Sequence, residues 1–190
     1  MTQAITRAKL TFEEYLLTPY DGRRTEFVNG EIVELLAPTG RHLDIVSDLG
    51  DLLKAYLRTH KPDCLVRSGA EIKIPQQSNS RNPDLLICTK AQWQVVRSQT
   101  KAEFLTGNPP LITVEVVSPG NPKKDTQELV IEYANAQILE YWIVNPIDEV
   151  VSIYVLDGQA YTLKGKYRGE QPVGSELLKH WNATAAEMLC

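Results

Sequence analysis

The chain has 190 residues, of which 43% are hydrophobic and 23% are charged, with a formal net charge of −4 and a sequence pI near 5.5. These values are typical of a globular protein with an apolar core, and we expect residues 1–190 to form a single domain. The acidic balance argues against a protein that coats nucleic acid non-specifically, because such proteins bind phosphates through an excess of basic residues.

The first elements expected along the chain are short and separated by turn signals. Thr11 and Glu14 have the spacing of a capping box, which predicts a short helix directly after Thr11. Asn29-Gly30 separates two alternating runs, Thr25–Val28 and Glu31–Leu36. This dipeptide predicts a β-hairpin, because both residues of such a tight turn need a positive φ.

A change of period marks a long helix. Between residues 40 and 59, apolar side chains recur every three or four positions, as they do on one face of an amphipathic helix. Short strands are expected next, at Cys64–Arg67 and Glu71–Ile74. We then expect a polar loop over residues 76–82, which leads into the apolar strand Leu85–Cys88.

The second half of the chain predicts a strand–helix–strand unit. Leu111–Val117 is apolar and β-branched apart from one carboxylate, which is typical of a strand buried on both faces. A helix over residues 124–136 and the strand Leu139–Val144 follow, which predicts a parallel pair with a right-handed crossover. The remaining elements are a hairpin of Val150–Leu156 and Ala160–Leu163 and a helix over residues 184–189. The expected fold class is therefore α/β (α+β), a mixed and largely antiparallel β-sheet flanked by helices, with an N-terminal and a C-terminal hairpin.

Two carboxylates stand out against apolar surroundings. Glu115 interrupts the apolar run Leu111–Val117, and Asp84 begins another apolar strand directly after Pro83, where turn chemistry is the alternative explanation. A buried carboxylate is costly unless it is protonated, hydrogen-bonded or bound to a cation, so Glu115 has either a functional partner or a salt bridge. If the two strands are neighbours, both carboxylates converge on one point. Hard oxygen ligands with few histidines suit Mg²⁺ or Mn²⁺ rather than zinc.

The sequence also predicts a location. No run of about eighteen apolar residues occurs, so we expect no membrane span. Residues 1–10 contain neither an apolar signal region nor a cleavage site of small residues. Cys64, Cys88 and Cys190 lack the spacings of zinc or redox motifs, and we interpret them as thiols in a reducing compartment. These features together predict a cytoplasmic protein.

An ordered set of short motifs recurs along most of the chain. The set comprises Asn29-Gly30-Glu31, His42 at the start of the long helix, Arg81-x-Pro83-Asp84, Glu115-Val-x-Ser118-Pro119, Asp125, Tyr133 and Glu140-Tyr141-Trp142-Ile143-Val144-x-Pro146. With this order over about residues 10–165, the chain resembles a bacterial family of restriction-endonuclease-like proteins (Uma-type) in the PD-(D/E)XK nuclease superfamily. The resemblance implies a restriction-endonuclease-like fold that hydrolyses phosphodiester bonds of DNA with Mg²⁺ or Mn²⁺.

The resemblance also implies roles for individual residues. Asp84 and Glu115 match the metal ligands of the superfamily, and an acid of the preceding hairpin, Glu34 or Glu26, would assist them. The match makes His42 a candidate catalytic residue as well, and the alternative is a hydrogen-bonded histidine of the core.

The lysine that helps to activate water in the superfamily is missing from its usual places. The superfamily motif has it two residues after the acid, where this chain has Val117. The resemblance implies that members of the family carry it instead on the following helix, four residues after the aspartate that matches Asp125, and this chain has Leu129 there. Lys123 or Lys124, just ahead of that helix, could reach back into the site. Gln127 could instead orient the water without a charge.

We therefore expect a metal-dependent DNA endonuclease that forms a homodimer through a sheet edge or hairpin, with the C-terminal hairpin and the Trp181 region as the candidate surface. One alternative is a catalytically degenerate domain that binds nucleic acid or a protein, because both expected lysine positions are apolar and the net charge is acidic. A second alternative is an interaction module in which Glu115 forms a salt bridge inside the core and no metal binds.

Overall fold

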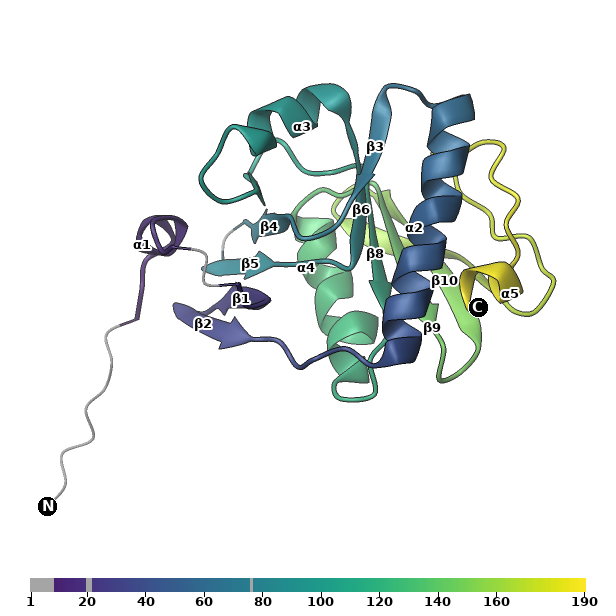
Figure 1. Ribbon diagram of the computed structural model, residues 1–190, viewed down its shortest axis with the longest axis horizontal. Coiled ribbons are helices and arrows are strands. Elements are labelled where there is room, and N and C mark those ends of the chain that lie inside the picture. The colour runs from purple at the N-terminus through teal and green to yellow at the C-terminus, as the bar shows by residue number, and fades with distance from the viewer. Residues whose placement is uncertain (1–8, 20–21, 76) are drawn as a thin grey trace, which may run out of the picture.

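The computed structural model describes residues 9–19, 22–75 and 77–190, and these form two β-sheets with helices packed against them (Figure 1). The other positions lie outside the described part, among them residues 1–8 of the N-terminal segment considered above and Gln76 of the expected loop. In the described ranges, none of the helices combines the length and the apolar character that crossing a bilayer requires.

The smaller sheet contains the N-terminal hairpin and has the strand order β2-β1-β5-β4-β7. Its strands are β1 (Thr25–Val28), β2 (Glu31–Glu34), β4 (Glu71–Ile74), β5 (Asn79–Arg81) and β7 (Glu103–Phe104). The turn between β1 and β2 has a φ of 52° at Asn29 and 86° at Gly30, so the predicted hairpin is confirmed. Strand β7 pairs parallel to β4, and the other neighbours are antiparallel.

The prediction of a polar loop over residues 76–82 is wrong in part, because the three-residue strand β5 lies within it. All residues of β5 are buried although none is apolar. Arg81 is held by Glu132, and Ser80 is held by Glu103. The strand is thus buried together with polar partners far away in the sequence, which a search for hydrophobic periodicity cannot reveal.

The larger sheet has the strand order β11-β10-β9-β8-β6-β3. Its strands are β3 (Cys64–Arg67), β6 (Leu85–Thr89), β8 (Ile112–Val116), β9 (Glu140–Asn145), β10 (Val150–Asp157) and β11 (Ala160–Tyr167). Strands β8 and β9 are parallel, as the strand–helix–strand pattern predicts, and the other neighbours are antiparallel. The expected mixed and largely antiparallel α+β fold is confirmed, divided between two sheets.

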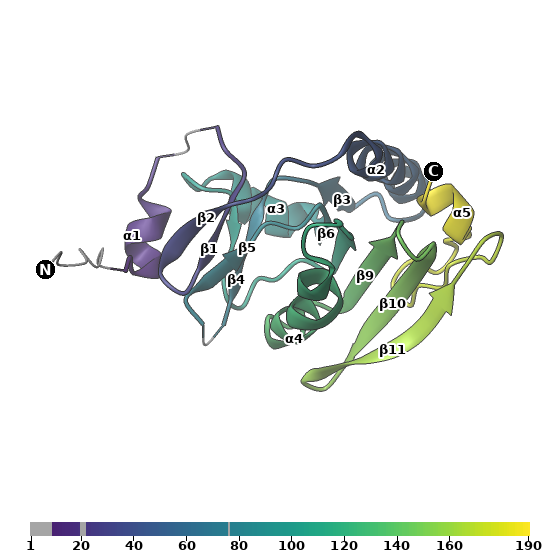
Figure 2. The same cartoon turned by 90° about the horizontal axis from the view of Figure 1, so that it is seen from below.

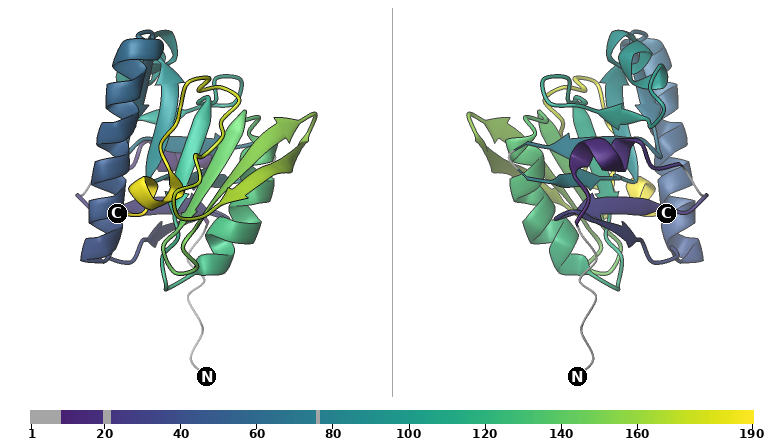
Figure 3. Two further views of the ribbon diagram at one scale, coloured as in Figure 1. Left: turned by 90° about the vertical axis from the view of Figure 1, so that its right-hand side faces the viewer. Right: turned by 90° about the vertical axis from the view of Figure 1, so that its left-hand side faces the viewer.

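Helices cover both faces of the larger sheet (Figures 2 and 3). The helices of the structure are α1 (Phe12–Leu16), which lies beside the smaller sheet, α2 (Gly40–His60), α3 (Lys90–Arg97), α4 (Leu129–Asn135), α5 (Ala185–Met188) and the π-helical turn η1 (Lys124–Glu128), which leads into α4. Helix α2 packs on one face, where Leu49 joins Val114 and other strand residues in an apolar core. Helix α4 packs on the opposite face, where Leu129 joins Ile143 of β9 and Ile72 of β4 in a second apolar core. Helix α4 therefore contacts both sheets.

Capping signals in the sequence mark the starts of several helices, whereas a search for hydrophobic periodicity does not detect the shortest elements. Thr11 and Thr184 form the capping boxes of α1 and α5, as their spacing to a glutamate predicts. Helix α3 and the two-residue strand β7 were not expected. The start of α3 carries the same signal, because Thr89 and Gln92 form a capping box there.

The Trp181 region packs on the core of its own chain. The Trp181 ring meets Tyr56 edge-on, with centroids 5.6 Å apart, and lies 5.8 Å from the ring of Trp142. These contacts show how the C-terminal segment closes the face covered by α2. The homodimer stays a prediction.

A network of polar side chains joins α1 to the smaller sheet. Ser80 Oγ lies 2.9 Å from Glu71 Oε2 and 2.8 Å from Glu103 Oε1, and the Tyr15 hydroxyl also donates to Glu71. A serine hydroxyl has one proton and cannot donate to two carboxylates, so this geometry favours a protonated Glu103. Burial, reinforced by the charge of Glu71, raises the pKa of Glu103 to about 8.

We expect Glu103→Gln to reduce the dependence of stability on pH. Folding raises the Glu103 pKa from 4.5 to about 8, so the wild type should lose free energy of unfolding as pH rises through this interval. Glutamine cannot ionise, and the variant should lose less. Urea unfolding at several pH values measures the difference, with the exposed Glu176→Gln as the control. Equal slopes in wild type and Glu103→Gln would show that folding does not raise the pKa of Glu103.

Candidate functional site

Strands β6 and β8 are neighbours, and they bring Asp84 and Glu115 to the same place. Their antiparallel register pairs Leu85 with Val114, so Asp84 and Glu115 lie opposite each other one position further along. The backbone N of Asp84 is 3.4 Å from Glu115 Oε2. The geometry thus brings together the two carboxylates that the sequence singled out.

The carboxylate of Asp84 is 6% exposed and is held from three directions. Its Oδ1 accepts a hydrogen bond of 2.8 Å from Arg24 Nη2 and lies 3.1 Å from His42 Nε2. Its Oδ2 accepts the backbone N–H of Val116 at 2.9 Å. Burial acts to raise the pKa of Asp84, but the bond to His42 and the charge of Arg24 together lower it below its ordinary value. Asp84 is therefore ionised at neutral pH.

Glu115 is also buried, but its surroundings have the opposite effect on its charge. Its Oε1 accepts a hydrogen bond of 2.6 Å from the Tyr133 hydroxyl. Burial and the charges of Asp84 and Asp125 raise the pKa of Glu115 well above its ordinary value. Among the described residues, Glu115 forms no ion pair with a lysine or arginine, so a salt bridge does not explain its burial. Burial and the charge of Asp84 thus disfavour the ionised form of Glu115, and a cation at this place would favour it.

Asp84 and Glu115 line a cavity of about 500 Å³, which we call the acidic cavity. Burial and the charge of Asp84 raise the pKa of Asp125 in the same cavity to about 6, against the opposing charge of Lys124. Carboxylates outnumber basic groups in the lining, so the cavity favours a cation as its first ligand. The carboxylates are Glu26, Glu34, Asp84, Glu115, Asp125 and Glu128, and the basic residues are Arg24, Arg81 and Lys124.

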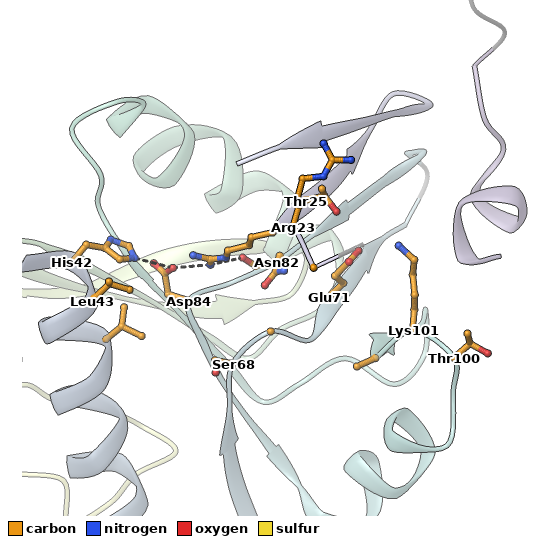
Figure 4. Close-up of a pocket in the computed structure, with 15 residues that line it drawn as sticks. Arg23, Thr25, His42, Leu43, Ser68, Glu71, Asn82, Asp84, Thr100 and Lys101 are labelled. Atoms are coloured by element: carbon orange, nitrogen blue, oxygen red, sulfur yellow. Dashed lines mark hydrogen bonds and ion pairs between the residues drawn. The ribbon is translucent and has the colours of Figure 1, made fainter. Parts of the chain in front are cut away.

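A second cavity, of about 570 Å³, adjoins the first and has the opposite balance of charge (Figure 4). Figure 4 shows His42 and Asp84 pointing toward each other on one side of this cavity, with Lys101 on the far side. We call it the basic cavity, because Arg23, Arg24 and Lys101 line it against Glu71 and Asp84. The residues that line both cavities are Arg24, His42, Asn82 and Asp84.

The other residues expected from the sequence lie at different distances from this centre. Lys124 lines the acidic cavity, and its Nζ is 2.8 Å from Glu26 Oε1. Lys123 and Gln127 are exposed and do not line either cavity. Glu34 lines the acidic cavity with a side chain that is 57% exposed, whereas Glu26 is 2% exposed. Lys124 is therefore the candidate for the missing lysine that lies at the site, and Glu26 is the candidate third acid that is enclosed there.

Neither position at which the resemblance led us to expect a lysine faces the acidic cavity. Val117 is 1% exposed and Leu129 is fully buried, and both belong to the apolar core around α4. A lysine at either position would place an ammonium group among apolar side chains. Lys124, one turn earlier in the helical segment, is the lysine that reaches the cavity.

Sequence reasoning missed several residues of the site. Arg24 carries no signal in the sequence, and Tyr133 appears there only as a member of the ordered motif set. Asn82 precedes the Pro83-Asp84 motif, and its Oδ1 is buried without a hydrogen-bond partner in the described part of the chain. His42 fits both interpretations given above, because it is buried on the apolar stripe of α2 and also contacts Asp84.

The comparisons with known proteins place the chain in a family. The Uma2 family model, described as "Putative restriction endonuclease", matches residues 12–186. The chain belongs to this family. Among solved structures, it is similar to one titled as a "putative nuclease belonging to DUF820" from Anabaena variabilis ATCC 29413. The TM-score is 0.76 at 15% sequence identity, over 95% of this chain and 97% of that chain, so the likeness concerns the fold. The search among curated proteins found no match.

The acidic cavity of this Uma2-family protein has a donor set that fits a hard divalent cation. Its central groups, Asp84 and Glu115, offer carboxylate oxygens, and Asn82 Oδ1 is an unsatisfied acceptor beside them. No cluster of three or more His, Cys, Asp and Glu side chains in the described ranges is arranged to hold a metal ion. The fit therefore rests on two carboxylates completed by water, which is a common way for proteins to bind Mg²⁺.

Buried ion pairs hold the wall of the acidic cavity together. Arg81, with a side chain 7% exposed, donates to Glu26 at 2.9 Å and to Glu132 at 2.6 Å. Arg81 thereby connects β1, β5 and α4. Burial acts to lower the pKa of Arg81, but Glu132 and Glu26 outweigh it and raise the pKa, so the guanidinium stays charged.

We expect Arg81→Met to destabilise the protein by about 3–5 kcal/mol, because Glu26 and Glu132 would be left buried without their partner. Urea unfolding measures the change. Lys54→Met, which breaks an exposed pair with Asp51, is the control and should cost under about 1 kcal/mol. Equal small losses in both variants would mean that Lys124 or water compensates for Arg81.

Proposed function

We propose that this Uma2-family protein is a metal-dependent endonuclease that hydrolyses phosphodiester bonds of DNA, with Mg²⁺ or Mn²⁺ as its cofactor. The observation that carries the proposal is the convergence of Asp84 and Glu115 from adjacent strands in a cavity that Lys124 also lines. The family match supports a nuclease. The metal dependence and the DNA substrate belong to the proposal.

The carboxylates would hold the cation, and neighbouring residues position them. Asp84 and Glu115 are the proposed ligands, and the bound cation supplies Lewis-acid chemistry for the attack of water on phosphorus. Tyr133 fixes the orientation of Glu115 through its hydrogen bond of 2.6 Å, and His42 does the same for Asp84 at 3.1 Å. Tyr133 and His42 are thus positioning residues in this scheme.

Lys124 is the proposed replacement for the lysine of the superfamily motif. Its side chain is 18% exposed, and its ammonium group is held at the cavity by Glu26. A positive charge at this place stabilises the negative charge that develops on the phosphate as water attacks. Glu26 is the proposed third acid of the site, and it acts by positioning Lys124.

A catalytically degenerate domain that binds nucleic acid or a protein is the second candidate. It is favoured by Val117 and Leu129, which are core residues at the two positions where a lysine was expected. This candidate predicts binding of nucleic acid without cleavage. A cytoplasmic location and a homodimer are compatible with both candidates and remain predictions.

We expect Asp84→Asn and Glu115→Gln each to abolish Mn²⁺ binding and Mn²⁺-dependent cleavage, because each removes a charged ligand while keeping the side-chain size. Calorimetry with Mn²⁺, and cleavage assays on DNA and RNA, measure these effects. Thermal unfolding checks that the variants fold, and the exposed Glu170→Gln is the control. Mn²⁺ binding that survives both substitutions would place the metal elsewhere. A wild type that binds nucleic acid but cleaves none would favour the second candidate.

We expect Lys124→Gln to lower kcat by about 10²–10³-fold, the usual loss when one charge-stabilising group is removed. Lys123→Gln is the matched comparison, because it removes the same charge one residue away on an exposed position outside the cavity, and it should remain close to wild type. Single-turnover cleavage of a DNA substrate measures both. The reverse ranking would assign the catalytic lysine to Lys123.

A further inference from the structure

The two cavities meet at one wall, and their charges differ across it. Arg24, His42, Asn82 and Asp84 line both cavities. On one side, the acidic cavity has twice as many carboxylates as basic groups, whereas basic groups outnumber carboxylates in the basic cavity. A cation and a phosphate therefore find complementary surroundings on opposite sides of the same wall.

Arg24 is a charged group of this wall that can interact with a ligand in either cavity. Its Nη2 donates to Asp84 Oδ1 at 2.8 Å and to the carbonyl oxygen of Asn82 at 3.1 Å. The Arg24 side chain is 38% exposed, so it has room to turn, whereas Asp84 is 6% exposed and fixed on its strand. A guanidinium at hydrogen-bond distance from Asp84 Oδ1 and a divalent cation on the same carboxylate repel each other. The Arg24 guanidinium and a divalent cation therefore compete for the Asp84 carboxylate.

The wall also contains an unsatisfied hydrogen-bond acceptor, the Oδ1 atom of Asn82. Asn82 is 8% exposed, and its Oδ1 has no hydrogen-bond donor among the described residues. Buried polar atoms in native proteins are nearly always satisfied, so an orphan at a cavity wall indicates a ligand, a cation or bound water. Asn82 thus adds an unsatisfied acceptor, two residues before Asp84, to the charged groups of this wall.

The basic cavity suits the backbone of a nucleic acid strand. None of the described residues that line it is a phenylalanine, tyrosine or tryptophan, so it offers no platform of these rings on which a base could stack. Lys101 faces it from the side opposite Asp84, with its Nζ 3.7 Å from the ring centroid of Tyr15. Basic groups without such platforms contact phosphates, which is binding without sequence readout.

We propose that Arg24 is an exchangeable counter-ion. In the metal-free protein it neutralises Asp84, and when a divalent cation binds Asp84 it turns to a backbone phosphate in the basic cavity. This inference rests on the proposed function, because it assumes that Asp84 binds a cation and that the substrate is a nucleic acid. It adds a phosphate subsite formed by Arg24 and Lys101, and it links metal binding to substrate binding.

The exchange predicts opposite effects of one substitution. Arg24→Gln removes the competitor for Asp84, so calorimetry should show Mn²⁺ binding about tenfold tighter than in wild type. Binding of a short fluorescent DNA duplex, followed by anisotropy and with the duplex checked to be intact, should weaken in Mn²⁺ but change little in EDTA. In Mn²⁺, the slope of log K against log salt should fall by about one, the value for one lost phosphate contact.

Two further variants separate the subsite from general charge effects. Lys101→Gln should reduce the salt slope by about one and leave Mn²⁺ affinity unchanged, because Lys101 lies away from Asp84. Arg97→Gln changes the net charge equally at an exposed position outside both cavities, and it should change neither quantity.

The outcomes distinguish the inference from the function on which it rests. If wild type binds Mn²⁺ and DNA but Arg24→Gln weakens both, Arg24 is a structural brace and the exchange is overturned. Equal losses of DNA affinity in EDTA and in Mn²⁺ also overturn it, since Arg24 would then contact phosphate at all times. A wild type that binds no Mn²⁺ overturns the proposed function together with the exchange.

Discussion

An ionised carboxylate that is almost fully enclosed must be neutralised by its surroundings, and the structure around Asp84 follows from this constraint. Arg24 reaches it from the segment before β1, His42 from α2, and the backbone N–H of Val116 from β8. One carboxylate thereby joins the smaller sheet, the long helix and the larger sheet. The two cavities adjoin at this point because the groups that satisfy Asp84 also form the wall between them.

The rest of the site is built in the same way, from buried polar pairs rather than apolar contacts. Arg81 connects Glu26 with Glu132, and Lys124 adds a second cation to Glu26. Such pairs contribute little net stability, because desolvation offsets most of their attraction, but each is costly to break. The two apolar cores lie behind this layer, so they provide the stability while the polar pairs fix the arrangement of the cavity walls.

What the sequence could predict depended on how far apart the interacting residues lie. The Asn29-Gly30 hairpin and helix α2 depend on local turn chemistry and periodicity, and both were predicted. Asp84 was recognised because an acid beside apolar residues is unusual. Its partner Arg24 is 60 positions away and carries no local signal, so only the fold reveals the pair. Strand β5 was missed for the same reason, since its polar residues are buried by distant partners.

The π-helical turn η1 has a consequence for how the family can diverge. Such a turn holds an additional residue compared with an α-helical turn. Deleting one residue there would rotate Lys124 and Asp125 by about 100° relative to Tyr133, which is anchored in the core. A point substitution in this stretch changes one side chain at the cavity. A deletion moves both Lys124 and Asp125 away from the cavity at once. The number of residues in this stretch therefore matters to the cavity as much as their identity does.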